Sequence, residues 1–346
     1  MAPHASTVMG KNALLPIVRP QREGYSWNVS RTDVDVEQTL SATDNGSLEV
    51  IAPRDVPLGG PRAMTVRRTL PSRSRTMVGA WCFLDHYGPD DVTDSGGMSV
   101  PPHPHTGLQT VSWLFDGEIE HRDSTGAHAF IRPGELNLMT AGSGIQHSEV
   151  STENTTVLHG VQLWVALPES ARHQSPHFDA VTSRRQRVGD GVVSLFMGSL
   201  ANVGLVRAPT YTKLLAAQID LPAHGSLTLQ LTPTCEHGLL IDTGMVTTPH
   251  GDIPTHHLGV LPTGHTEWTL TAGNSPVRAV LIGGEPLGEE IVMWWNFVGK
   301  SHGDIVEARN QWQEGLPHGS QRFGHLPHMP ALPAPELPTV TLKSRK

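Results

Sequence analysis

Two short segments of the chain carry metal-capable side chains at alternate positions. Residues 103–105 read His-Pro-His, and residues 147–149 read His-Ser-Glu. In an extended strand, residues i and i+2 project from the same face, so each segment would aim two ligands in one direction. Two such strands lying together would converge three imidazoles and one carboxylate on a point. The spacing therefore predicts a metal site formed by His103, His105, His147 and Glu149.

The chemistry of this donor set narrows the choice of metal. Three neutral imidazoles and one carboxylate would leave a divalent ion with one net positive charge. An octahedral ion would keep two positions for water, oxygen or a chelating substrate. Imidazole and carboxylate together suit Fe(II), with Mn, Ni, Co, Cu or Zn as alternatives, and the set is close to the two-histidine-one-carboxylate arrangement of non-haem iron. We therefore expect Fe(2+), with another divalent transition metal as the alternative.

The remaining histidines offer no comparable pairing. The chain has 20 histidines, and single ones such as His173 and His224 are most simply surface or hydrogen-bonded residues. His256 and His257 are adjacent, so they would face opposite sides of a strand, and the nearby His265 has no partner at alternate spacing. The C-terminal part adds three more, which are typical of solvated residues although they could bind adventitious metal: His318, His325 and His328.

The residues around the two segments indicate how strands would position them. Residues 141–146, which lead into the second segment, read Ala-Gly-Ser-Gly-Ile-Gln, and glycine permits the tight turns and close backbone approach that the mouth of a barrel needs. Pro104 cannot donate to a sheet ladder, which places the first segment at the start or edge of a strand. Both features are expected of an accessible site.

Short apolar segments between turn residues predict an all-β chain with two lobes. The first series of expected strands covers residues 78–84, 108–115, 136–139 and 157–167, and the second covers residues 211–221, 226–231, 238–241, 267–270 and 279–282. The lobes are expected to divide near residues 180–205. A helix is expected late, over residues 303–312, where Ile305, Ala308 and Trp312 recur at near-helical spacing.

Net charge and cysteine content exclude several classes of function. The formal charge of −8 argues against a general nucleic-acid-binding surface, which needs clustered Lys and Arg. With only Cys82 and Cys235, a disulfide framework is excluded, and a reducing cytoplasm is the expected compartment. The N-terminus lacks a secretory signal and no run of about 18 apolar residues occurs, so no membrane span is expected.

A basic run precedes the first series of strands. Its members are Arg54, Arg62, Arg67, Arg68, Arg73 and Arg75. A solvated basic rim is the simplest interpretation. Contact with an anionic partner, or with acidic groups on a neighbouring lobe, is the alternative.

Three segments resemble the pirin family: residues 103–111 (HPHTGLQTV), 139–149 (MTAGSGIQHSE) and 160–165 (GVQLWV). Residues 78–79, 85–89 and 283–287 agree with it, and the resemblance covers roughly residues 60–312. It implies a bicupin, with two tandem cupin barrels (double-stranded β-helix or jelly roll) and iron bound only in the first. Carried over residue by residue, the family's ligands fall on the four residues named above.

The expected organisation follows from the resemblance and the composition. Residues 1–55 form a partly disordered N-terminal extension, residues 56–195 the metal-binding N-terminal cupin domain, and residues 196–315 the C-terminal pirin-type cupin domain with its late helix. Residues 316–346 form a Pro/His-rich tail for which the sequence predicts no regular structure. The extension and the tail both lie outside the family pattern.

Gln109 is one departure from the family. Pirins often have a glutamate at this place, four residues after the second histidine. Because the resemblance assigns the carboxylate role to Glu149, we expect metal binding to survive. Gln109 would then lie beside the ligands, where polar groups orient them.

The resemblance implies two functions of different kinds. Pirins resemble quercetin 2,3-dioxygenases, which implies a flavonol-like substrate whose ring is cleaved by oxygen with release of carbon monoxide. Glu149 would act there as ligand and as catalytic base. The alternative is an iron-dependent, redox-sensitive regulator that binds a transcription factor or a metabolic enzyme, with the basic run as a candidate surface. A third interpretation is a metal that mainly stabilises its barrel.

Overall fold

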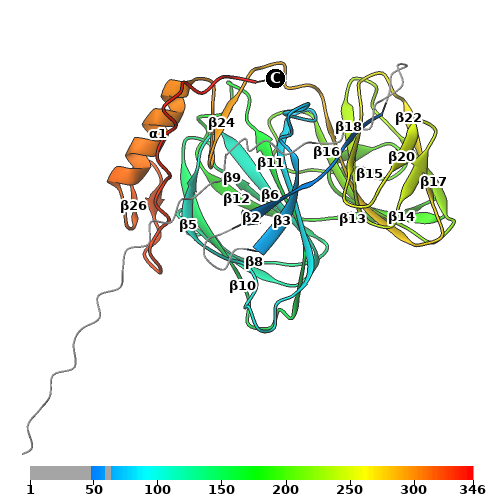
Figure 1. The fold of residues 1–346 in the computed structure, drawn as a ribbon, viewed down its shortest axis with the longest axis horizontal. Helices are drawn as coiled ribbons and strands as arrows, with labels where there is room; N and C mark the ends of the chain where they lie inside the picture. The colour runs from blue at the N-terminus through cyan, green and yellow to red at the C-terminus, as the bar shows by residue number, and fades with distance from the viewer. Residues whose placement is uncertain (1–47, 59–63, 346) are drawn as a thin grey trace, which may run out of the picture.

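The computed structural model describes residues 48–58 and 64–345. Most of the expected N-terminal extension, residues 1–47, and Arg62 of the basic run lie outside the described residues. The described chain is mostly β-strand, with two lobes side by side and one α-helix against the outer side of the first lobe (Figure 1). The all-β prediction with two cupin domains and a short C-terminal helix is confirmed.

The first lobe consists of two antiparallel sheets that face each other. The larger has the order β12 (His177–Thr182), β9 (Glu135–Thr140), β6 (Leu108–Asp116), β11 (Val157–Ala166), β4 (Trp81–Asp91), β3 (Met64–Leu70) and β2 (Arg54–Leu58). The smaller has the order β5 (Ser99–His105), β10 (Ile145–Ser151), β7 (Ile119–Asp123) and β8 (His128–Ile131). Buried apolar residues from both sheets, among them Leu114 and Ile119, fill the space between them.

The second lobe repeats this plan. Its larger sheet runs β1 (Glu49–Ile51), β21 (Leu258–Leu261), β18 (Glu236–Thr243), β23 (Val277–Gly284), β16 (Leu214–Leu221), β14 (Gly191–Leu200) and β13 (Arg184–Val188), with β15 (Gly204–Val206) paired to β14. Its smaller sheet runs β17 (Ser226–Gln230), β22 (Glu267–Ala272), β19 (Val246–Thr248) and β20 (Gly251–Ile253). The chain passes from the first lobe to the second between β12 and β13, at Ser183. This point lies within residues 180–205, where the lobes are expected to divide, and before residue 196, where the C-terminal domain is expected to begin.

An apolar interface joins the larger sheets of the two lobes. Trp113 of β6 stacks on Phe196 of β14 with ring centroids 4.2 Å apart, and Trp81 of β4 donates from its indole nitrogen to the Gly283 carbonyl at 3.0 Å. Large side chains buried on both sides exclude water from this contact. The lobes are therefore packed against each other over a shared core.

Four described members of the basic run make contacts within the molecule: Arg54, Arg67, Arg68 and Arg75. Arg68 forms a buried bidentate pair with Asp85 at 2.6 and 2.7 Å. Arg75 bridges Glu49 and Glu236, at 2.6 and 3.0 Å, and so ties the segment between β3 and β4 to the second lobe. For Arg75, contact with acidic groups of the neighbouring lobe is the correct interpretation.

The single described helix, α1 (His302–Glu314), is capped by Ser301, whose hydroxyl accepts from the Asp304 backbone N–H at 3.2 Å. Its buried face consists of Ile305, Ala308 and Trp312, as the spacing predicts. The hairpin of β24 (Val292–Trp294) and β25 (Phe297–Gly299) leads into it. No helix among the described residues is long and apolar enough to cross a membrane.

Residues 316–345, the C-terminal tail, are ordered against the first lobe. The tail contains the short pair β26 (Gly319–Ser320) and β27 (Gly324–His325). Beyond it, the Leu332 N–H donates to the Pro102 carbonyl of β5 at 2.8 Å, and the Leu332 carbonyl accepts from the Trp312 indole at 2.9 Å. These contacts with other elements of the fold set the position of the tail. Its sequence therefore needs no periodic pattern of its own.

Candidate metal centre

The two predicted ligand segments lie on adjacent strands. β5 is the edge strand of the smaller sheet, as Pro104 requires, and it pairs with β10 so that His103 lies directly opposite His147. His105 lies two residues further along β5 on the same face. The register shifts between His147 and Glu149, which marks a β-bulge at this point.

Three of the four predicted residues converge within a few ångströms. The Nε2 atoms of His105 and His147 are 3.1 Å apart, and the rings of His103 and His147 have centroids 4.3 Å apart. One donor nitrogen from each of these three histidines lies within 4.8 Å of the others. When two neutral imidazoles meet through their Nε2 atoms, only one of these atoms can carry the proton of a hydrogen bond between them. A cation beside them would instead accept the lone pairs of both atoms. The residues present therefore fit a divalent metal.

Glu149 belongs to a second group that overlaps the first through His147. Its carboxylate, a nitrogen of His147 and a nitrogen of His121 also lie within 4.8 Å of one another. Glu149 Oε1 accepts from the Ser112 hydroxyl at 3.3 Å, and Ser112 contacts Gln162 Oε1 at 3.0 Å. In the regular pairing of β10 with β7, Glu149 lies directly opposite His121, which places the carboxylate on the His121 side of the cluster.

His121 is a candidate ligand that sequence reasoning missed. It lies on β7 directly opposite Glu149, while Asp123 lies opposite His147. His121 Nε2 is 3.1 Å from Asp123 Oδ2, so it donates there and leaves Nδ1, which is 3.4 Å from His147 Nδ1, with its lone pair. The signal is the same alternation, since residues 121–123 read His-Arg-Asp, whereas the predicted site rests on the His-x-His and His-x-Glu spacings.

Burial sets the charge state of the cluster. Desolvation lowers the pKa of His103 to about 4 and holds the pKa values of His105 and His147 well below their usual value, each with help from neighbouring histidines. Desolvation also raises the pKa of Glu149. Neutral imidazoles have free lone pairs at neutral pH, and the raised pKa of the carboxyl reflects a charge that lacks a cation. A bound metal ion would supply that cation.

Gln109 does not take part in either ligand group. Its amide nitrogen donates to Thr140 Oγ1 and to the Pro209 carbonyl, both at 2.8 Å. The expectation that Gln109 orients the ligands therefore finds no contact that supports it. The side chain instead connects β6 to β9 and to the loop between β15 and β16 of the second lobe.

Comparison with known proteins identifies the family. The pirin family model matches residues 63–165, and the model of the pirin C-terminal cupin domain matches residues 216–318. A Pseudomonas aeruginosa protein with the provisional name quercetin 2,3-dioxygenase is 43% identical over 315 residues, which cover 89% of this chain and 96% of that protein. The chain belongs to the pirin family.

Two further relatives extend this result across both cupin domains of the pirin. A pirin-like protein of Caulobacter vibrioides is 33% identical over 279 residues, covering 78% of this chain and 94% of that protein. The crystal structure of a quercetin 2,3-dioxygenase from Acinetobacter baumannii is 33% identical and superposes with a TM-score of 0.81, covering 87% of this chain and 98% of that one. Fold and domain order are thus shared over most of the chain.

Proposed function

We propose that this pirin is a metal-dependent oxygenase of the quercetin 2,3-dioxygenase type, with Fe(II) held by His103, His105, His147 and Glu149. The observation that carries the proposal is the convergence of three neutral imidazoles beside a buried carboxylate in the first lobe. The names of the Pseudomonas and Acinetobacter proteins support it, because both refer to this reaction.

A divalent ion held by these residues would supply Lewis acidity that favours the deprotonated 3-hydroxyl of a flavonol. Glu149 has the properties of the base that receives the proton. Its carboxylate lies within 4.8 Å of donor nitrogens of His121 and His147, and the Ser112 hydroxyl donates to its Oε1 atom and holds it in place.

Aromatic side chains border the cluster and make it suited to a flat, apolar substrate. His105 meets the edge of Trp164 with centroids 5.2 Å apart, and Trp164 in turn stacks on Phe83 at 4.0 Å. On the other side, His121 stacks on Phe178 at 4.5 Å. These rings exclude water from the ligands, which strengthens the electrostatic interactions inside the site.

Entry of a substrate requires movement, because none of the four proposed ligands is more than 6% exposed. A groove of about 730 Å³ lies between α1 and the loops around Ser143 and Arg172, and none of the four ligands lines it. We therefore expect substrate binding to depend on local opening of the first lobe.

The proposal is tested with chain reconstituted anaerobically with Fe(II) and mixed with quercetin and oxygen. Oxygen consumption with stoichiometric release of carbon monoxide is expected. The His147→Ala variant should lose metal and activity, whereas His224→Ala, a histidine in the second lobe, should keep both. Absence of turnover with Fe, Mn, Ni, Co and Cu alike would exclude the oxygenase.

The regulatory alternative receives less support. Its candidate surface was the basic run, and there Arg68 and Arg75 are occupied by intramolecular ion pairs. A pull-down with reduced and oxidised protein separates the two functions, because a redox-dependent partner without flavonol turnover would favour the regulator.

A further inference from the structure

We propose a second metal site at the junction of the two lobes, formed by His86, His159 and Asp242, for a divalent transition ion such as Zn²⁺ or Co²⁺. His86 lies on β4 and His159 on β11, which are neighbouring strands of the first lobe. Asp242 lies on β18 of the second lobe. A metal here would join the two cupin domains directly.

The three side chains already converge on one oxygen atom. Nε2 of His86 is 2.7 Å from Asp242 Oδ1, and Nε2 of His159 is 2.6 Å from the same atom. All three residues are buried, and one donor atom from each lies within 4.8 Å of the others. Two imidazoles and a carboxylate are a common donor set for Zn²⁺ and related ions.

Only a small adjustment would admit an ion. Donors bound to Zn²⁺ at about 2.0–2.1 Å in a tetrahedron lie about 3.3 Å apart, so Asp242 would have to withdraw by about 0.6 Å. Its second oxygen, Oδ2, is buried and has no hydrogen-bond partner among the described residues. The nearest cation to Oδ2 is Arg278, at 3.7 Å. The carboxylate therefore has spare coordinating capacity.

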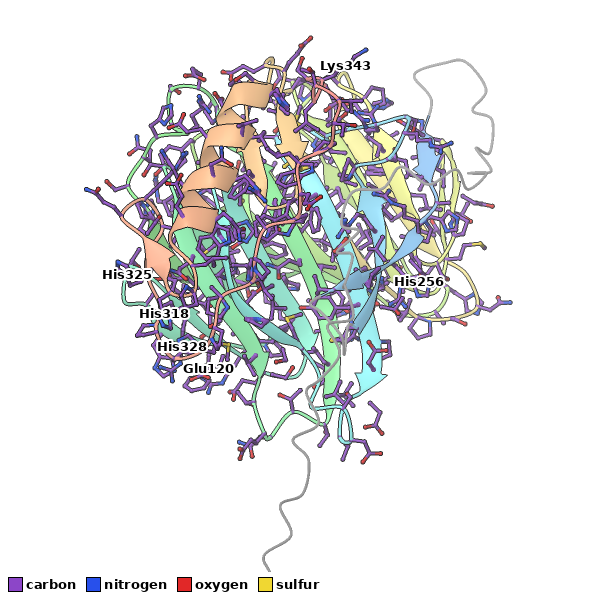
Figure 2. All side chains as sticks on the ribbon, turned by 60° about the vertical axis from the view of Figure 1, so that its left-hand side comes forward. Glu120, His256, His318, His325, His328 and Lys343 are labelled. Atoms are coloured by element: carbon purple, nitrogen blue, oxygen red, sulfur yellow. The ribbon has the colours of Figure 1, made fainter. Side chains whose placement is uncertain are left out.

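His256 lies next to this group, although its donor nitrogens are not part of it. Its ring centroid is 5.4 Å from that of His86, and its φ of 66° is a left-handed conformation that is unfavourable for histidine. Its N–H donates to the Ile241 carbonyl at 2.7 Å, which fixes it next to Asp242. Figure 2 shows His256 well separated from the tail histidines His318, His325 and His328, so the two groups are distinct.

Arg67 hinders metal binding at this site, so replacing Arg67 tests the proposal independently of the ligand variants. Arg67 Nε donates to His86 Nδ1 at 3.3 Å, so without metal His86 carries its proton on Nε2 and donates it to Asp242. Binding through Nε2 requires His86 to move this proton to Nδ1, and Arg67 must turn aside. The imidazole stays neutral throughout, and no proton is lost from the site.

The experiment is equilibrium dialysis of the full chain against Zn²⁺, with the metal content per protein measured after removal of free ion. Two equivalents are expected for the natural chain, and one each for Asp242→Asn, His159→Gln and His147→Ala. The double variant Asp242→Asn/His147→Ala should bind none. His257→Gln and His328→Gln are matched controls that should keep two.

Arg67→Met should lower the Kd of the junction site about tenfold, because it removes a positive charge and the competing donor together. Circular dichroism of each metal-free variant checks the fold, and Arg67→Met remains decisive if an Asp242 variant does not fold. One equivalent in the natural chain that folded Asp242→Asn keeps, or two equivalents in folded Asp242→Asn and His159→Gln, would overturn the site.

Discussion

Replacing Gln146 by alanine should loosen the metal-bearing strands from the C-terminal tail. Gln146 immediately precedes His147, and its side chain points to the opposite face of β10. Its amide nitrogen donates to the carbonyls of His318 and Gly324, at 3.0 and 2.7 Å. Both hydrogen bonds are partly buried, so each carbonyl that loses its donor costs an amount in the lower part of the range of about 1–3 kcal/mol, because water recovers part of it. The expected loss in the free energy of unfolding is therefore about 2–4 kcal/mol.

Two assays check this prediction. Urea unfolding gives the loss of stability, and transfer of bound metal to a chromophoric chelator gives its release rate. Release should be faster in Gln146→Ala, because the residue next to His147 loses its anchor. Gln230→Ala makes the same change at an exposed position of the second lobe and should shift stability by no more than about 0.5 kcal/mol.

A second variant, in the tail, disturbs the same contact between Gln146 and the tail. A Cβ added to Gly319 would lie 2.1 Å from Gln146 Nε2 and 2.0 Å from the Gly324 carbonyl oxygen, so Gly319→Ala should also destabilise. Because both changes act on one contact, their effects should fall short of additivity by more than about 0.5 kcal/mol. Strict additivity, or unchanged metal release in Gln146→Ala, would refute the reasoning.

Three other predictions follow from buried groups. Burial lowers the pKa of His237 to about 4, so the unfolded chain takes up this proton first as pH falls from about 6.5, and up to about 3 kcal/mol of stability is lost by pH 4. His237→Gln should lose correspondingly less between pH 7.5 and 4.5 in urea titrations, and an equal loss would contradict the assignment. Asp85→Asn breaks the buried pair with Arg68 and should cost about 3–5 kcal/mol, measured by calorimetry, where a change under 1 kcal/mol would count against it. Ser112→Ala frees Glu149 Oε1 and should weaken metal binding in competition titrations while leaving the fold intact by circular dichroism; unchanged affinity would show that Ser112 does not position the carboxylate.

Local periodicity explains what could be predicted from the sequence. The alternation at residues 103–105 and 147–149 places side chains on one face of a strand whatever the rest of the chain does. Pro104 likewise indicated an edge strand, and β5 is one. The late helix followed from the spacing of its buried residues.

The features that depend on tertiary contacts could not be predicted in the same way. Glu149 comes close to His121 through the pairing of β10 with β7, which the two segments do not reveal by themselves. The group at the lobe junction draws on β4, β11 and β18, so its members have no common spacing in the sequence. The tail is polar and rich in proline, and contacts with β5, β10 and α1 position it.

The contact between Leu332 and Pro102 also has a consequence for the order of events during synthesis. Leu332 is made 183 residues after Glu149 (332 − 149). At about 5–20 residues per second, all four proposed ligands exist for about 10–40 s before the tail can cover the edge of β5. During translation, the first lobe thus has an interval in which its metal-bearing edge strand is still open, and afterwards the end of the chain closes over it.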